Sequence, residues 1–331
     1  MCAVIRHEDL FRAIAADLVV ESPERFRHRE LGAFTPPRDL ETTADRPLLV
    51  PLCRTVYLLY HAGDQPSARL FLGGGHAARA VHDLEDAEHA ERLSHAARRY
   101  GQWSGGWTVT ELRGPDAVVA RDGLALLARP HELSEPAERA GQMLGVRFRT
   151  DHPYRVPGWY CVVGEVGRPK SADLVRIYFC LDNPDAAPAL LTAVLDELNR
   201  HRIAFEAKTV NNPASLLRRD SFVVYLERPE WERHRGFFTD LRRTHEADLR
   251  EDYPRFALRL DKGLSYAQDP DLPEGTMSFG EHRSLLVAEG LLDAFDAGAR
   301  TAAERFQAIR ARYRAAGLDV RTPYLNGEPA R

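Results

Sequence analysis

Apolar residues in the second half of the chain recur with the spacing of β-strands. In the run 174–181 every second residue is apolar, so Arg176 and Tyr178 share the opposite face of the predicted strand. Further runs rich in β-branched and aromatic residues span 159–166, 203–210 and 221–227. The pattern predicts a sheet with one apolar face, and a second face on which a cation and a phenol lie side by side.

Helical spacing alternates with these strands. An apolar stripe follows the run 174–181 and consists of Leu191, Val194, Leu195 and Leu198. Ser278 with Glu281, and Thr301 with Glu304, have the spacing of capping boxes at helix starts. We therefore expect one helix packed on the sheet and two more helices at the C-terminal end, the first of them running towards Gly298.

The first half of the chain has weaker patterns. Leu10, Ile14 and Leu18 indicate a short amphipathic helix, and the apolar run 48–60 favours a helix over a strand. The charged, alanine-rich stretch 85–100 also predicts a helix, which would end at Gly101.

Short β-like runs between 103 and 129 are separated by Gly114-Pro115 and Asp122-Gly123, which predicts an antiparallel meander. The polar, proline-flanked stretch 130–136 is typical of a linker. We therefore expect an α+β protein with a mixed, largely antiparallel sheet and packed helices. Residues 1–135 would form a helical and meander subdomain that binds a partner or peptide, and residues 136–331 a catalytic domain.

Composition narrows the classes of function. The 331 residues have 44% hydrophobic content and a formal charge of -4, so no global charge excess favours nucleic acid or membrane partners. Any anion site must be local. The four cysteines lack a CxxC pair, and no HExxH-like spacing appears, so we expect a reduced compartment and neither metal nor cofactor. No apolar run is long enough to span a bilayer, which predicts a cytoplasmic protein.

Three segments in succession identify a resemblance. VRIYFCL, then FEAKTVNNPASLLRRDSFVVYL after a helix, and then SFGEHRSLLVAEGL are similar to the HopA-type type III effector family. Relatives of that family in class V lanthipeptide and related thioamitide clusters include phosphopeptide lyases. The similarity covers about 103–298, and 173–225 also resembles, more distantly, the core of bacterial phosphothreonine lyase effectors.

The resemblance implies roles for particular residues. By its match to those effectors, Lys208 would remove the Cα proton of a phosphorylated residue, and Arg218 or Arg219 would hold phosphate. Tyr225 would line the site, and Arg283 would be a further phosphate contact. The resemblance also implies a phosphorylated precursor peptide as substrate, a Ser/Thr kinase and possibly a cyclase as partners, and dehydroalanine or dehydrobutyrine as product.

One departure from the effectors concerns the general acid. Where they place a lysine and an acid histidine on the first strand, this sequence has Leu174 and Arg176. His282, in the first turn of the helix after Ser278, is the candidate substitute acid. Arg176 is a candidate catalytic cation, and two further candidates for phosphate binding are Tyr178 and Lys170.

To accept the Cα proton, Lys208 must be in its neutral form. An ordinary lysine, with a pKa of about 10.4, is neutral in about one of 2,500 molecules at pH 7. Neighbouring arginines would lower its pKa and a bound phosphate dianion would raise it, so the sequence leaves the net direction open. Arginine suits the phosphate role because its planar guanidinium makes bidentate contacts.

Each assignment has an ordinary alternative. Lys208 also fits a solvated strand-end lysine, Arg218 and Arg219 a charged turn, and His282 a hydrogen-bonded scaffold residue. Asp220 would orient Arg218 by an ion pair. Two functions remain: a lyase that β-eliminates phosphate from phosphoserine or phosphothreonine, and a non-catalytic phosphopeptide-binding module that uses the same arginines. A phosphatase is disfavoured, because no nucleophilic cysteine motif or metal carboxylate set appears.

Overall fold

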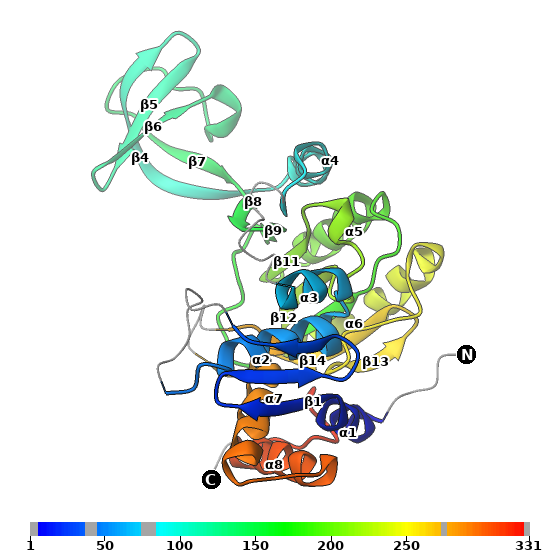
Figure 1. Ribbon diagram of the computed structural model, residues 1–331. Helices are drawn as coiled ribbons and strands as arrows, with labels where there is room; N and C mark the ends of the chain where they lie inside the picture. The colour runs from blue at the N-terminus through cyan, green and yellow to red at the C-terminus, as the bar shows by residue number, and fades with distance from the viewer. Residues whose placement is uncertain (1–5, 37–44, 74–83, 273–276, 328–331) are drawn as a thin grey trace.

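A seven-stranded antiparallel sheet forms the centre of the molecule (Figure 1). The computed structural model describes residues 6–36, 45–73, 84–272 and 277–327. The strand order is β13-β14-β10-β12-β11-β9-β8. The strands are β8 Asp151–Val156, β9 Trp159–Val163, β10 Leu174–Phe179, β11 Phe205–Val210, β12 Phe222–Glu227, β13 Leu258–Asp261 and β14 Leu264–Gln268. The α+β class is confirmed, and every pairing between these strands is antiparallel.

One face of this sheet is apolar and carries helices. Val175, Ile177 and Phe179 of β10 point into a core that includes residues of α5 Ala186–Arg200 and α6 Arg228–Thr244. The predicted stripe of α5 is buried there. Burial of this apolar surface is the main force that holds the helices on the sheet.

The opposite face is covered over part of its area. Segments from both ends of the chain meet there and share a core with Tyr178 and Val223 of the sheet (Figure 1). They are α1 His7–Asp17, β1 Leu18–Ser22, β2 Arg25–His28, β3 Gly32–Phe34, α2 Leu49–Val56, η1 Tyr57–Ala62, α3 Gln65–Leu72, α7 Phe279–Asp296 and α8 Ala302–Ala315. The two predicted capping boxes form at the starts of α7 and α8. Among the residues that the structure describes, none covers the rest of this face as these segments do.

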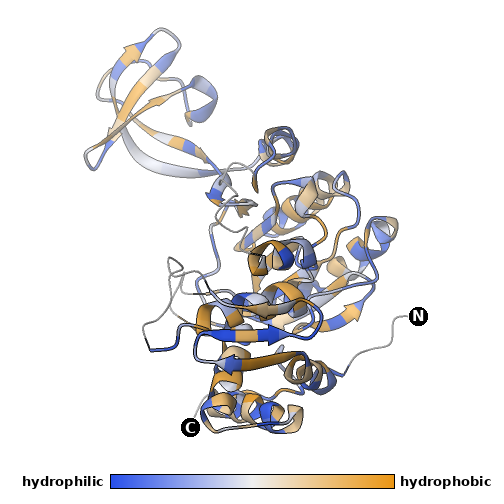
Figure 2. Cartoon of the chain, viewed as in Figure 1, coloured by the Kyte–Doolittle hydropathy of each residue, from blue (hydrophilic) through white to orange (hydrophobic). Residues whose placement is uncertain are grey.

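A small four-stranded sheet projects away from the rest of the molecule (Figure 1). Its strands carry both hydrophobic and hydrophilic residues (Figure 2). It consists of β4 Gly101–Arg113, β5 Asp116–Arg121, β6 Leu124–Ala128 and β7 Met143–Arg149 and follows α4 Ala87–Ala97; short 3₁₀ turns lie at η4 Pro130–Glu132, η5 Pro213–Ser215 and η6 Glu246–Asp248. The meander is confirmed. Because β7 pairs with β4, this sheet continues past the predicted division at 135/136.

Several local predictions differ in detail from the structure. Leu18 begins β1 instead of continuing the first helix, and Gly101 begins β4 rather than ending α4. The run 48–60 is helical, as predicted, and its second part is π-helical. Within the described residues, no helix is both long and apolar enough to cross a bilayer. Cys53, Cys161 and Cys180 are free thiols.

Candidate active-site cleft

The open part of the second sheet face forms a cleft of about 1230 Å³. Its floor consists of side chains from β9, β10, β11 and β12, and its walls come from β8, the segment 167–172, residues 269–272 and three residues between 277 and 281. The charged and titratable residues that line it are His152, Arg155, Cys161, Arg168, Lys170, Arg176, Glu206, Lys208, Tyr225, Asp269, Asp271 and Glu281. Four of the predicted site residues, Lys208, Arg176, Tyr225 and Lys170, are among them.

Strand register explains why residues distant in sequence meet on this floor. Arg176 pairs with Tyr225, which pairs with Glu206 on the next strand. In the adjacent row Lys208 pairs with Cys161, which pairs with His152. Paired residues in neighbouring strands project to the same side, about 4.5–5.5 Å apart. The register therefore gathers cations and aromatic rings within two rows.

Lys208 lies between two aromatic rings. Its Nζ is 4.4 Å from the ring centroid of Trp159 and 5.7 Å from that of Tyr225. Within the described residues, no carboxylate forms an ion pair with this ammonium. Burial, and next the charge of Arg176, lower the pKa of Lys208, although Asp220 opposes them. In the free protein the direction that the sequence left open is thus downwards, which favours the neutral amine.

Arg176 is held in place by partners on two sides. Its Nε donates to Asp269 Oδ1 at 2.5 Å, and its guanidinium carbon lies 4.8 Å from the ring centroid of Tyr225. The side chain is 8% exposed. An arginine fixed by one carboxylate and stacked on a ring keeps other N–H groups for a ligand anion.

Further cations stand around the cleft. Arg155 Nη2 and Arg168 Nε lie 3.2 Å and 3.1 Å from the two carboxylate oxygens of Glu206. Lys170 is exposed at the rim. Glu206 therefore pairs with two arginines that come from the walls of the cleft. Tyr225 lies between Glu206 and Arg176 on the floor.

Arg218 and Arg219 lie beyond the cleft, in the loop between β11 and β12. Arg218 donates to both oxygens of Asp220 at 3.0 and 2.9 Å, which is the ion pair that the Arg-x-Asp spacing predicts, and its guanidinium carbon lies 5.2 Å from the ring centroid of Trp159. Arg219 Nε donates to Asp252 at 2.9 Å. Lys208 and Arg218 thus both pack on Trp159, and neither arginine is among the residues that line the cleft.

His282 and Arg283 do not line the cleft, although Ser278 and Glu281 at the start of the same helix do. Arg283 is fully buried and donates to Pro323 O, Leu325 O and Asn326 Oδ1 at 2.7, 3.1 and 3.0 Å, so it ties α7 to the C-terminal segment. Its Nη1 lies 2.6 Å from His282 Nδ1. Burial and the neighbouring Arg283 lower the pKa of His282 to about 4, so this imidazole is neutral at pH 7 and poorly suited to donate a proton.

Tyr178 of β10 and His61 of η1 are buried where helices cover the second face of the sheet. Tyr178 is buried, and its hydroxyl finds no hydrogen-bond partner within the described part of the chain. Its ring packs edge-on against His61, 6.4 Å between centroids. Burial lowers the pKa of His61 to about 3. Tyr178 thus shares the face of Arg176 as predicted, but it lies under the helices that cover this face.

Cys161 is on the cleft floor beside Lys208. Burial raises the pKa of this thiol to about 11, so it is protonated at neutral pH. Since the thiolate is the nucleophilic form, the geometry does not favour a cysteine phosphatase.

Several residues of the cleft were not predicted as site residues, among them Glu206, His152 and Asp269. The strand alternation that places Lys208 on the polar face also places Glu206 there, and this signal was present in the sequence. His152 and Asp269 had no such signal, because their positions depend on which strands pair across the sheet.

The fold is an antiparallel α+β fold, and its cleft is lined by five lysine and arginine side chains together with four carboxylates. Residues 150–325 match the HopA1 effector protein family. The chain belongs to this family, which confirms the predicted resemblance. The match starts where the small four-stranded sheet ends, so β4 to β7 lie outside it.

Two solved structures of effector proteins from Pseudomonas syringae are similar to the chain. The protein from pathovar tomato strain DC3000 has a TM-score of 0.41 and 19% identity, and that from pathovar syringae strain 61 has 0.41 and 17%. Each comparison covers 51% of this chain and 63% of the other, so this chain spans less than two thirds of either effector. A search of curated proteins found no match.

Proposed function

We propose that the protein is a phosphopeptide lyase, which β-eliminates phosphate from phosphoserine or phosphothreonine in a precursor peptide. One observation carries the proposal: Lys208, whose pKa is lowered and which has no carboxylate partner in the described structure, lies on the same cleft floor as the anchored cation Arg176. Two of the three lysines in the chain, Lys170 and Lys208, line this cleft.

In the proposed reaction the neutral Nζ of Lys208 accepts the Cα proton of the phosphorylated residue. The electron pair of the broken C–H bond forms the Cα=Cβ bond, and the Cβ–O bond breaks with its electrons going to phosphate. No water is consumed. The products are inorganic phosphate and a dehydroalanine or dehydrobutyrine residue, and Lys208 carries one proton to be released.

Arg176 is the proposed phosphate anchor, with Lys170 at the rim. Arg155 and Arg168 stand at the Glu206 wall and would contribute positive potential. A cation that is already oriented by Asp269 costs little reorganisation as charge develops on the leaving phosphate. In this arrangement the phosphate lies over Tyr225, and the peptide backbone lies over Lys208 and Trp159.

His152 is the histidine that lines the cleft, but it lies on the side of Lys208 away from Tyr225 and Arg176, so it is not assigned as the proton donor to the departing phosphate. It lines the cleft two strands from Lys208, in the same register row, which corresponds to about 10 Å between backbones. His152 faces the cleft, whereas His282 is turned to Arg283. The kinase and cyclase partners predicted from the sequence would act before and after this step, one supplying the phosphorylated peptide and the other using the dehydro residue.

The test is mass spectrometry of a phosphoserine or phosphothreonine precursor peptide, with its leader, after incubation with the purified protein. We expect loss of the mass of phosphoric acid in the wild type and in the matched control Lys262→Ala, and a rate lower by about 10²–10⁴-fold in Lys208→Ala and Lys208→Arg.

Other outcomes would contradict the proposal. A product one water heavier than the dehydro peptide is the unphosphorylated peptide with serine or threonine restored. This product would mean hydrolysis instead of elimination. An unchanged peptide that binds in a phosphate-dependent way, equally well to the Lys208→Arg variant, means a recognition module in which the cations bind phosphate without chemistry.

A further inference from the structure

Two helices on the apolar face of the sheet carry matching pairs of metal-binding side chains. Glu197 and His201 are four residues apart at the end of α5, and Glu230 and His234 are four residues apart in α6. Residues at this spacing lie on the same side of a helix. Because α5 and α6 pack side by side on the sheet, the two pairs face each other on the side opposite the cleft.

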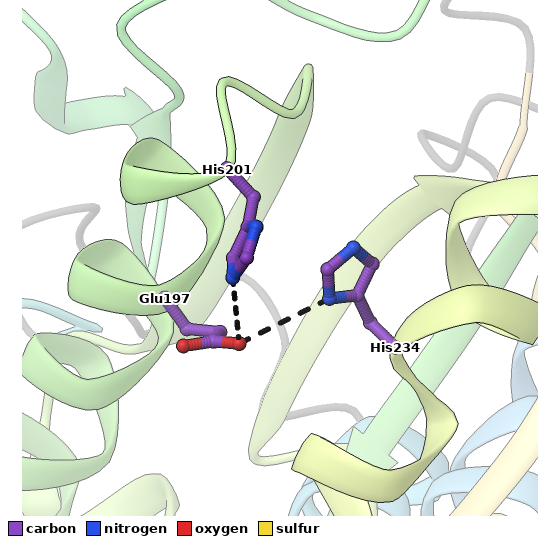
Figure 3. Close-up of side chains that lie close together, drawn as sticks. All are labelled: Glu197, His201 and His234. Atoms are coloured by element: carbon purple, nitrogen blue, oxygen red, sulfur yellow. Dashed lines mark ion pairs between the residues drawn. The ribbon is translucent and has the colours of Figure 1, made fainter.

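Three of these side chains converge on one point (Figure 3). His201 Nε2 lies 3.3 Å from Glu197 Oε1, and His234 Nδ1 lies 4.0 Å from the same oxygen. One ligand atom from each residue lies within 4.8 Å of the others, and the imidazole centroids are 4.9 Å apart. Ligands about 2.0–2.2 Å from a tetrahedral zinc ion lie about 3.3–3.6 Å from one another, so small side-chain rotations complete the geometry.

The surrounding residues suit such an ion. Arg200 pairs with the other carboxylate oxygen of Glu197, Oε2, which leaves Oε1 facing the two imidazoles. His234 Nε2 lies 3.8 Å from Glu230 Oε2, so a carboxylate stands behind the ring nitrogen that points away from the centre. A carboxylate in that position orients a metal-binding histidine and increases its basicity. His201 is 45% exposed, which gives the ion a path from solvent.

We propose that Glu197, His201 and His234 bind one divalent transition-metal ion of the zinc class, which joins α5 to α6. Two imidazoles and one carboxylate favour zinc over magnesium or calcium, and water would fill the fourth position. The site is structural, since the sheet separates it from the cleft, and it is independent of the proposed lyase activity. No metal was predicted from the sequence, because these ligands come from two helices and do not form a recognisable spacing within one segment.

The experiment uses the untagged full-length protein, zinc chloride in calorimetry, and cobalt chloride in absorption spectroscopy. We expect one equivalent of zinc to bind, visible d–d bands of tetrahedral cobalt, and a higher thermal midpoint at roughly a hundredfold excess of zinc over its Kd. His201→Ala and His234→Ala should each weaken binding at least tenfold, and Glu230→Gln about 10–100-fold. The matched control His95→Ala, an exposed histidine on α4, should bind as the wild type does.

Binding that survives in the His201→Ala/His234→Ala double variant, or a wild type that binds no zinc, overturns the proposal. His201 is exposed, so His201→Ala tests the site even if His234→Ala fails to fold. Elimination of phosphate is a separate readout: loss of zinc binding with elimination intact, or the reverse, tells the two proposals apart.

Discussion

On the helix-covered face of the seven-stranded sheet, Val175, Ile177 and Phe179 point into an apolar core, whereas Arg176 points from the same strand into an open cleft. Alternate residues of one strand therefore belong to the apolar core on one side of the sheet and to the cleft on the other. The first face gains stability by removing apolar surface from water, and the second holds cations close together at a cost in stability. Substitutions on the apolar face should therefore lower mainly stability, and substitutions on the cleft face should lower mainly the proposed activity.

The largest expected effect is on the apolar face. Phe179 is fully buried between Phe222 and Phe238, with ring centroids 6.1 Å and 6.4 Å away. Phe179→Ala should lower the free energy of unfolding by about 4 kcal/mol, because it leaves a cavity in a packed core. Urea denaturation measures this. Lys170→Ala at the cleft rim is the control, with a change within about 0.5 kcal/mol; similar losses in both variants would refute the division between the faces.

The next effect tests whether Arg283 is structural or binds phosphate. Arg283→Met removes three hydrogen bonds to the C-terminal segment and leaves two backbone carbonyls unpaired. We expect a loss of about 3 kcal/mol in stability, measured by denaturation. The exposed Arg321→Met should change little. A stable Arg283→Met protein that no longer binds phosphopeptide would instead support the phosphate contact predicted from the sequence.

A smaller effect of opposite sign is expected at Lys208. Lys208→Met keeps the packing on Trp159 and Tyr225 but removes a cation whose charged form the site disfavours. We expect stability to rise by about 1 kcal/mol at pH 7 while elimination is lost.

This gain should depend on pH. Because the pKa of Lys208 is lower in the folded than in the unfolded protein, the unfolded chain binds more protons between the two values, and wild-type stability rises with pH there. The advantage of Lys208→Met should therefore shrink as pH increases towards 10.5, the ordinary lysine value. An advantage that is constant with pH, or a less stable variant, would argue against a destabilised ammonium.

The smallest effect concerns the pH dependence of elimination. The rate should rise with pH as Lys208 loses its proton and level off below pH 10.5. Arg176 helps to lower this pKa, so Arg176→Met should move the plateau to higher pH, by about one unit or less, besides slowing the reaction. The pH dependence of kcat/KM, which reports groups of the free protein, measures both. A plateau that stays in place in Arg176→Met would mean that the two cations are not coupled.

The sequence by itself determined β9 to β12 and the helices α5, α7 and α8, the face on which Arg176 and Lys208 lie, and the family, but not β8, α6, β13 or β14. Periodicity and capping residues act over a few positions, so they can be recognised along the chain. It did not determine that Asp269 would meet Arg176, that Lys208 and Arg218 would both pack on Trp159, or that His152 rather than His282 would face the cleft. Strand order and register decided these contacts, because each joins residues whose proximity depends on the pairing of distant segments.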